Sequence, residues 1–303
     1  MSALQRPRYV TRSNEQAFPP PYLQAGCQLY GFWIRATEEK LQACCERFLQ
    51  RPSRGAVRVT VAAPFVFLYF CSFARTQSLH PTEGERGWLG ENECGLWIPV
   101  MYEANAAPPS FAFFPFMMFV DSGPAAISGR EVLGFPKEIG HITLPGDGAL
   151  PSLFAVDALA FLQQGRKHAG RFTKLIELRM STEAPRLQAC SMLREVFPFI
   201  RPLLRPLRRR RGRIPLLLLK QIRDAVAPEL ACHQSVLACT PDSIAVRSLR
   251  VLQGSYQIEF HPCASHPIVE DLGIETTSLG AARGFFVDMD FTLGQTEILW
   301  EAQ

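Results

Sequence analysis

The chain has 303 residues, of which 47% are hydrophobic and 20% are charged, and its formal net charge is +4. This composition is typical of a globular protein and excludes extensive disorder and collagen-like sequence. The longest charge-free apolar stretch, residues 104–120, contains three prolines and is too short for a transmembrane helix. The N-terminal residues lack the apolar core of a secretory signal, and we expect a cytoplasmic protein without a membrane span.

The first part of the chain combines a polar tail with a helix. Residues 1–17 are polar, and we expect a flexible tail ahead of a single domain over residues 18–303. Thr37 can cap a helix, because the apolar residues that follow it recur at the spacing of an amphipathic helix. These apolar residues are Leu41, Cys44, Cys45, Phe48 and Leu49.

Most of the remaining chain has the patterns of β-strands, either alternating or almost continuously apolar. The predicted strands are residues 29–34, 57–61, 65–73, 97–102, 111–120, 139–144, 235–239, 244–252, 256–261 and 285–293. Between them, a proline-interrupted helical pattern runs into an Arg-rich segment, and we expect an excursion from the domain at about 170–213. Many strands, few helices and no βαβ alternation predict an α+β fold that is mainly antiparallel β.

The cysteines and histidines show no metal-ligand spacing. The chain has nine cysteines with no C-x-x-C pair, and six histidines with no H-E-x-x-H spacing. We therefore expect reduced thiols, no disulfide framework and no metal site. The motifs G-x-S-x-G, G-x-G-x-x-G and G-x-x-x-x-G-K-S/T are absent as well, and we expect no cofactor.

Seven arginines and no acidic residue lie between Arg201 and Arg213. Such a run can bind nucleic acid, anionic lipid or an acidic ligand. No aromatic residue lies among these arginines to stack on bases. We therefore interpret the run as a solvated surface loop and expect no nucleic-acid partner.

Lys137 is the candidate for covalent chemistry. Only five of the 32 basic residues are lysine, so a lysine that follows the apolar turn Gly134-Phe135-Pro136 calls for an explanation. Burial disfavours the charged form and lowers the pKa of a lysine, and a neutral amine can attack a carbonyl to form a Schiff base. The alternative is a lysine whose apolar stem is packed while its charge reaches water.

Three segments resemble the acetoacetate decarboxylase family, in the family's order and spacing. Residues 129–137, G-R-E-V-L-G-F-P-K, resemble its active-site lysine segment. Residues 93–100, E-C-G-L-W-I-P-V, resemble a segment with an active-site glutamate, and residues 117–125 resemble a neighbouring strand. The resemblance covers nearly the whole chain and implies a large antiparallel β-barrel or cone with peripheral helices, assembled as a homo-oligomer.

The resemblance also implies roles for single residues. Lys137 would form the imine, and Glu93 would act as an acid, a base or a positioning group. Phe135 and Met118 would line the apolar walls of a pocket for a small oxo-acid substrate.

One departure from the family pattern follows the lysine directly. Decarboxylating members have a second lysine at the position of Glu138. A carboxylate that pointed into the same pocket would raise the pKa of Lys137 and would meet the substrate. We therefore include Glu138 among the expected substrate-site residues.

Two further pocket positions also differ. An arginine expected just before the first strand falls near Cys27 or Gln28, and a glutamate expected in the second strand falls near Tyr69, which we include in the site. Arg35 and Arg130 are candidates to replace the missing arginine as the partner of a substrate carboxylate. Arg130 could instead form a structural ion pair, for example with Glu131.

Three functions remain open from the sequence. The first is a Schiff-base-forming lyase that decarboxylates a β-keto acid. The second uses the same imine on a pyruvate-like oxo acid, as an aldolase, dehydratase or cyclase without decarboxylation. The third is a non-catalytic ligand-binding member of the family.

Overall fold

The computed structural model describes residues 7–146, 150–181 and 213–302. The strands of this part of the chain form one sheet of thirteen. They are β1 (Tyr22–Arg35), β2 (Arg58–Val61), β3 (Phe65–Ser78), β4 (Leu89–Glu103), β5 (Ser110–Val120), β6 (Lys137–Thr143), β7 (Leu153–Ala160), β8 (Arg171–Met180), β9 (Leu216–Arg223), β10 (Ala231–Val251), β11 (Tyr256–Phe260), β12 (Ser278–Ala282) and β13 (Gly284–Glu301). The helices are α1 (Glu38–Cys45) with its continuation η1 (Glu46–Gln50), η2 (Gly84–Arg86), α2 (Gly123–Ser128) with its continuation η3 (Gly129–Leu133), and α4 (Ile268–Leu272).

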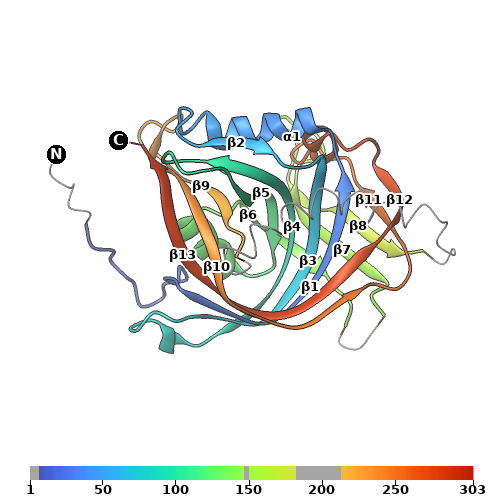
Figure 1. Ribbon diagram of the computed structural model, residues 1–303, viewed down its shortest axis with the longest axis horizontal. Helices are drawn as coiled ribbons and strands as arrows, with labels where there is room; N and C mark the ends of the chain where they lie inside the picture. Colours follow the sequence, from blue (N-terminus) through green and yellow to red (C-terminus); the bar gives the residue numbers. More distant parts are fainter. Residues whose placement is uncertain (1–6, 147–149, 182–212, 303) are drawn as a thin grey trace.

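The strand pairings close a circuit. The strands β5, β9, β10, β13, β1, β3 and β4 follow one another, and β4 pairs with β5 again. From β5, the strands β6, β7, β8, β11 and β12 continue the sheet as an arm. Apart from β5–β6 and β5–β9, the pairings between these strands are antiparallel, which confirms the predicted mainly antiparallel β fold. Figure 1 shows the strongly curved sheet, with α1 lying across one end.

The strand β3 separates two apolar volumes, because successive side chains of a strand point to opposite faces. Val66, Leu68 and Phe70 pack into the main hydrophobic core. The alternate residues of the strand, which include Phe67 and Tyr69, belong to a second cluster. The almost continuous apolar sequence of this strand is therefore explained by burial on both faces.

The predicted helix is confirmed, although its cap differs. Leu41 and Leu49 are fully buried in α1 and η1, as the apolar spacing predicted. Thr37 precedes the helix, but its hydroxyl donates to the main-chain oxygen of Gly273 instead of capping the helix. Thr37 therefore ties α1 to the segment that follows α4.

The expected excursion at about 170–213 is wrong at its start. Residues 171–180 form β8, which pairs with β7 on one side and β11 on the other. This strand was not predicted because charged residues lie toward both of its ends, although its central residues 175–178 are buried. Residues 182–212, with most of the arginine run, lie outside the described residues, whereas Arg213 forms an ion pair of 2.7 Å with Asp242.

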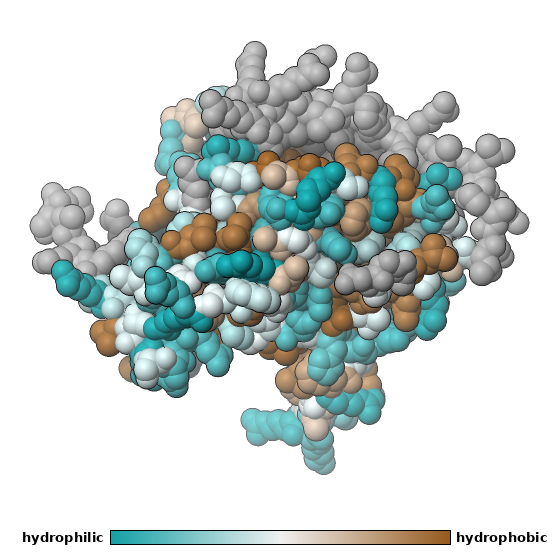
Figure 2. Space-filling view, turned by 90° about the horizontal axis from the view of Figure 1, so that it is seen from below, coloured by the Kyte–Doolittle hydropathy of each residue, from teal (hydrophilic) through white to brown (hydrophobic). Residues whose placement is uncertain are grey.

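The surface is mixed in character. Figure 2 shows hydrophilic and hydrophobic side chains interspersed over the described part of one face. The eight cysteines among the described residues are free thiols, and most of them are buried. No helix among these residues is long and apolar enough to cross a membrane.

Candidate active site

Lys137 opens β6, and the preceding helical segment holds it in place. Ser122 caps α2 by accepting a hydrogen bond from the Ala125 main-chain nitrogen, and η3 continues the helix to Leu133. A Cβ atom on Gly129 would lie 2.7 Å from Cδ of Lys137, so the lysine stem fits only against glycine. The segment 129–137 thus positions the Lys137 side chain by packing its stem against Gly129.

Glu93 on β4 contacts the lysine, and Tyr69 on the paired strand β3 contacts Glu93. Glu93 Oε2 lies 2.9 Å from Lys137 Nζ, and the Tyr69 hydroxyl donates to Glu93 Oε1 at 2.6 Å. Tyr69 lies opposite Gly95 in the β3–β4 pairing, and a Cβ atom on Gly95 would lie 2.4 Å from the tyrosine ring. The sequence Glu93-Cys94-Gly95 therefore supplies both the carboxylate and the space for the hydroxyl that orients it.

The prediction that burial leaves Lys137 with a lowered pKa is wrong for this geometry. Burial lowers the pKa of Lys137, but the neighbouring Glu93 carboxylate raises it, and the net shift is upward. The lysine is therefore an ammonium group at rest, and its nearest proton acceptor is Glu93.

Lys137 lies between two cavities. The first, here called the apolar chamber, encloses about 980 Å³ of empty space including its opening to solvent. It is lined mainly by apolar side chains and also by Lys137, Glu93 and Tyr69. The apolar walls include Leu29, Phe73, Trp97, Phe113, Met118 and Phe135. No arginine of the described residues lines this chamber.

The second cavity, here called the polar chamber, encloses about 670 Å³ on the same basis. Lys137, Phe135 and Gln24 line both chambers. The polar chamber adds Glu91 and Arg86, together with hydroxyl groups and the ring of Trp88. The lysine amine can therefore be approached from one apolar and one polar side.

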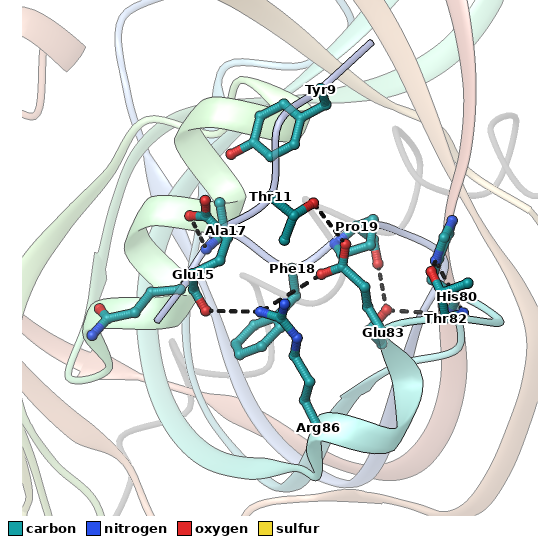
Figure 3. Close-up of polar contacts among 12 residues, drawn as sticks. Tyr9, Thr11, Glu15, Ala17, Phe18, Pro19, His80, Thr82, Glu83 and Arg86 are labelled. Carbon is teal, nitrogen blue, oxygen red and sulfur yellow. Dashed lines mark hydrogen bonds and ion pairs between the residues drawn. The ribbon is translucent and has the colours of Figure 1, made fainter. Parts of the chain in front are cut away.

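The N-terminal segment covers the polar chamber. Phe18 forms part of its wall, and the main-chain nitrogen of Phe18 donates to the Ser128 hydroxyl at 2.9 Å. Figure 3 shows Arg86 reaching toward the main-chain oxygen of Glu15 and toward Glu83, which also accepts a hydrogen bond from Thr11. Residues 7–17, which we expected to belong to a flexible tail, thus make hydrogen bonds to η2 and α2 in this structure.

The structure brings some of the expected site residues together. Tyr69, Glu93, Met118, Phe135 and Lys137 all line the apolar chamber. The Phe135 ring centroid lies 5.7 Å from Lys137 Nζ, close enough for a cation–π contact. These five residues therefore lie around one cavity, and their roles as nucleophile, acid/base partner and pocket wall stay predictions.

Arg130 and Glu138 lie outside both chambers. Arg130 Nη1 donates to the Lys137 main-chain oxygen at 3.0 Å, so it supports the backbone of the lysine. The side chain of Glu138 points away from Lys137 on β6, and its Oε2 lies 2.9 Å from His266 Nε2. Their expected contact with substrate is not supported by this geometry, because both side chains are committed elsewhere.

The position expected to hold an arginine is apolar here. Cys27 lines the apolar chamber, whereas the guanidinium of Arg35 lies over the Phe65 ring, 5.5 Å from its centroid. Arg86, which sequence reasoning missed, is the arginine that lines the polar chamber. It lies in η2, where no sequence pattern pointed to the pocket.

Sequence reasoning also missed Glu91. It lies two residues before Glu93 on the same face of β4, and only 4% of it is exposed. The predicted strand begins at Trp97, so the first half of β4 was missed as a strand, and Glu93 was found only through its motif. The E-x-E spacing on a strand is the signal that could have found Glu91.

Within the described residues, no group of three or more histidine, cysteine or acidic side chains is arranged to hold a metal ion. Carboxyl groups and a phenol lie near Lys137. The carboxyl groups can transfer protons, and the lysine amine can attack a carbonyl carbon.

Comparisons with solved structures identify the fold. An acetoacetate decarboxylase from Legionella pneumophila is 17% identical, with a TM-score of 0.61 over 99% of this chain and 94% of that one. An acetoacetate decarboxylase-like enzyme from Sphingomonas wittichii is 15% identical, with a TM-score of 0.59 over 96% and 98%. The enduracididine biosynthesis enzyme MppR, complexed with pyruvate, is 14% identical, with a TM-score of 0.56 over 95% and 93%.

No curated protein sequence matches the chain. Residues 5–153 match the model of the acetoacetate decarboxylase family, and this part contains Glu91, Glu93 and Lys137. The family resemblance predicted from the sequence is thus confirmed: residues 5–153 match the acetoacetate decarboxylase family, and the described chain has the fold of a solved member.

Proposed function

We propose that the protein is a Schiff-base-forming lyase that binds a small oxo acid on Lys137 and decarboxylates a β-keto acid. The observation that carries this proposal is the buried contact of 2.9 Å between Lys137 Nζ and Glu93 Oε2 at the wall of an apolar chamber. A surface lysine with a packed stem would need no such partner, so the geometry favours chemistry over the packing alternative.

The first step is proton transfer from the Lys137 ammonium to Glu93. The transfer replaces a buried ion pair by a neutral amine and a neutral acid, and the apolar surroundings reduce the cost of losing both charges. The free amine then attacks the ketone carbon of the substrate, and loss of water gives the imine. Tyr69 holds Glu93 by its hydrogen bond and keeps the carboxyl group directed at the amine.

The apolar chamber supports loss of carbon dioxide. A substrate carboxylate that lies among Phe113, Met118 and Trp97 meets no arginine there, among the described residues. Burial of a charge without a partner is unfavourable, and release of neutral carbon dioxide removes that charge. The electrons of the broken C–C bond pass to the protonated imine and leave an enamine.

A second candidate is imine chemistry without decarboxylation, on a pyruvate-like oxo acid. Two chambers meet at Lys137, and a second carbonyl compound could approach the enamine from the side opposite the first substrate. The lysine that follows the nucleophile in decarboxylating members is Glu138 here, which also favours this candidate. The solved complex of the structurally similar MppR with pyruvate adds an example of an oxo acid in this fold.

Borohydride trapping tests the proposal. The full chain is incubated with acetoacetate or pyruvate and then reduced, and the modified peptide is identified by mass spectrometry. We expect an adduct on Lys137, none in Lys137→Ala, and release of carbon dioxide from acetoacetate that is lost in the same variant. An adduct with pyruvate and none with acetoacetate would select the second candidate. Absence of both adducts would leave the non-catalytic alternative.

We also propose a homo-oligomer, as the family resemblance implies. Exposed apolar residues along β10, such as Val246, Leu249 and Val251, support this proposal. Light scattering after size exclusion tests it, and a monomeric mass would contradict it.

A further inference from the structure

Glu91 has one carboxyl oxygen without a hydrogen-bond partner. Within the described residues, Glu91 Oε2 is buried and unpaired, although the side chain lines the polar chamber together with Lys137. A buried acceptor without a partner costs free energy, and such groups are rare in folded proteins. Glu91 therefore needs an explanation other than structural pairing.

Thr76 gives Glu91 only a weak hydrogen bond. The Thr76 hydroxyl donates to Gln24 Oε1 at 2.6 Å and to Glu91 Oε1 at 3.1 Å. A hydroxyl group has one proton, so the shorter contact with Gln24 leaves little of it for Glu91. The Glu91 carboxyl group thus has one weak partner for one oxygen and none for the other.

The surroundings of Glu91 favour its neutral form. Burial raises the pKa of Glu91, the charge of Lys137 opposes this effect, and the nearby Glu93 and Asp121 add to it, so the net shift is upward. Glu93 differs, because it accepts a hydrogen bond from Tyr69 and faces the lysine ammonium. The two carboxyl groups on one face of β4 thus differ in their partners: Glu93 is paired with Lys137 and Tyr69, whereas one oxygen of Glu91 has no partner.

We propose that Glu91 is a second catalytic residue, the acid that protonates the substrate carbon on the enamine formed at Lys137. In this step the enamine electrons form the new C–H bond, the O–H bond of Glu91 breaks, and the nitrogen lone pair restores the protonated imine. When water then adds to the imine carbon, its proton returns to the Glu91 carboxylate. The inference rests on the proposed function, since it requires an imine on Lys137.

Proton exchange at carbon separates this role from imine formation. The full chain is incubated in D₂O with pyruvate or acetone, and loss of the methyl proton signal is followed by NMR while parallel samples are trapped with borohydride. General acid–base catalysis contributes roughly 10²–10⁴-fold, and we expect Glu91→Gln to lose at least about 100-fold in exchange rate. The yield of the Lys137 adduct should stay near the wild-type value, which also shows that the variant folds.

Two further variants complete the test. Glu91→Asp keeps the acid and should recover part of the exchange rate, which a purely structural role would not explain. Glu103→Gln changes a partly exposed glutamate at the end of the same strand, paired with Arg58, and should leave exchange unchanged. Adduct formation with undiminished exchange in Glu91→Gln would overturn the role of Glu91 alone. Failure of the wild-type chain to form any adduct would overturn the proposed function, and this inference with it.

Discussion

The ion pair of Lys137 and Glu93 should be measurable as a coupling energy. Only 10% and 7% of the two side chains are exposed, so removal of either partner leaves a charge in the protein interior. Breaking such a buried pair costs about 3–5 kcal/mol, because the remaining charge loses its partner without regaining water. We expect losses of this order in the free energy of unfolding for Lys137→Met and for Glu93→Gln.

The double variant should lose less than the sum of the single losses. With both charges removed, no unpaired charge is left, and the coupling energy in the cycle should reach at least about 2 kcal/mol. Urea unfolding at neutral pH, followed by tryptophan fluorescence, gives the four free energies. The substitutions Lys40→Met at an exposed position and Glu103→Gln at a partly exposed one form the control cycle and should be additive. Additive losses in the Lys137 and Glu93 cycle would refute the reasoning, since the contact would then contribute nothing to stability.

Three other predictions follow from the site. Gly129→Ala places a methyl group 2.7 Å from Lys137 Cδ, and the displaced amine should form the borohydride adduct roughly 10²-fold more slowly while the circular dichroism stays unchanged. Tyr69→Phe removes a hydrogen bond to a buried carboxylate, and urea unfolding should show a loss of about 1.5–3 kcal/mol. The pKa of His266 is raised by its hydrogen bond to Glu138, and the pKa of Glu138 is lowered by the same bond. The histidine contributes its stability below its ordinary pKa and loses it as the pH rises through the raised value, whereas the glutamate contributes above its ordinary pKa and loses it as the pH falls. Glu138→Gln should therefore reduce stability most between about pH 4.5 and 6.5, and an equal loss at pH 9 would contradict this.

The fold could be predicted where the side-chain pattern is local. The spacing of Leu41 and Leu49 located α1, and the apolar run of β3 located a strand buried on both faces. The strand β8 was missed because its charged ends hide a buried centre that only pairing with β7 and β11 explains. The two strands predicted near Thr240 are one long β10, whose register shifts absorb the irregular sequence between them.

The site could be predicted where a motif fixes the backbone. Lys137 and Glu93 were found from their segments, and the structure brings them within 2.9 Å. Arg86 was missed because its place at the polar chamber depends on how the N-terminal segment and η2 fold over the sheet, and Glu91 because the predicted strand began at Trp97. The sequence also could not predict on which side of β6 the Glu138 side chain lies. That side depends on the β5–β6 register, which sets Lys137 opposite Met118.

The charge of Lys137 leads to a last prediction, on pH. Burial alone would favour the neutral amine, but the Glu93 carboxylate reverses the balance and raises the pKa of Lys137. If the amine had to lose its proton to bulk water, the rate of imine formation would rise about tenfold per pH unit below that pKa. If Glu93 accepts the proton, the ion pair and the neutral pair contain the same number of protons, and the rate should be independent of pH over roughly pH 6 to 8.

Adduct formation with pyruvate, measured with excess cyanoborohydride so that imine formation limits the rate, distinguishes the two cases. A tenfold rise per unit in the wild-type chain would exclude Glu93 as the acceptor, whereas a flat profile that becomes steep in Glu93→Gln would assign it that role.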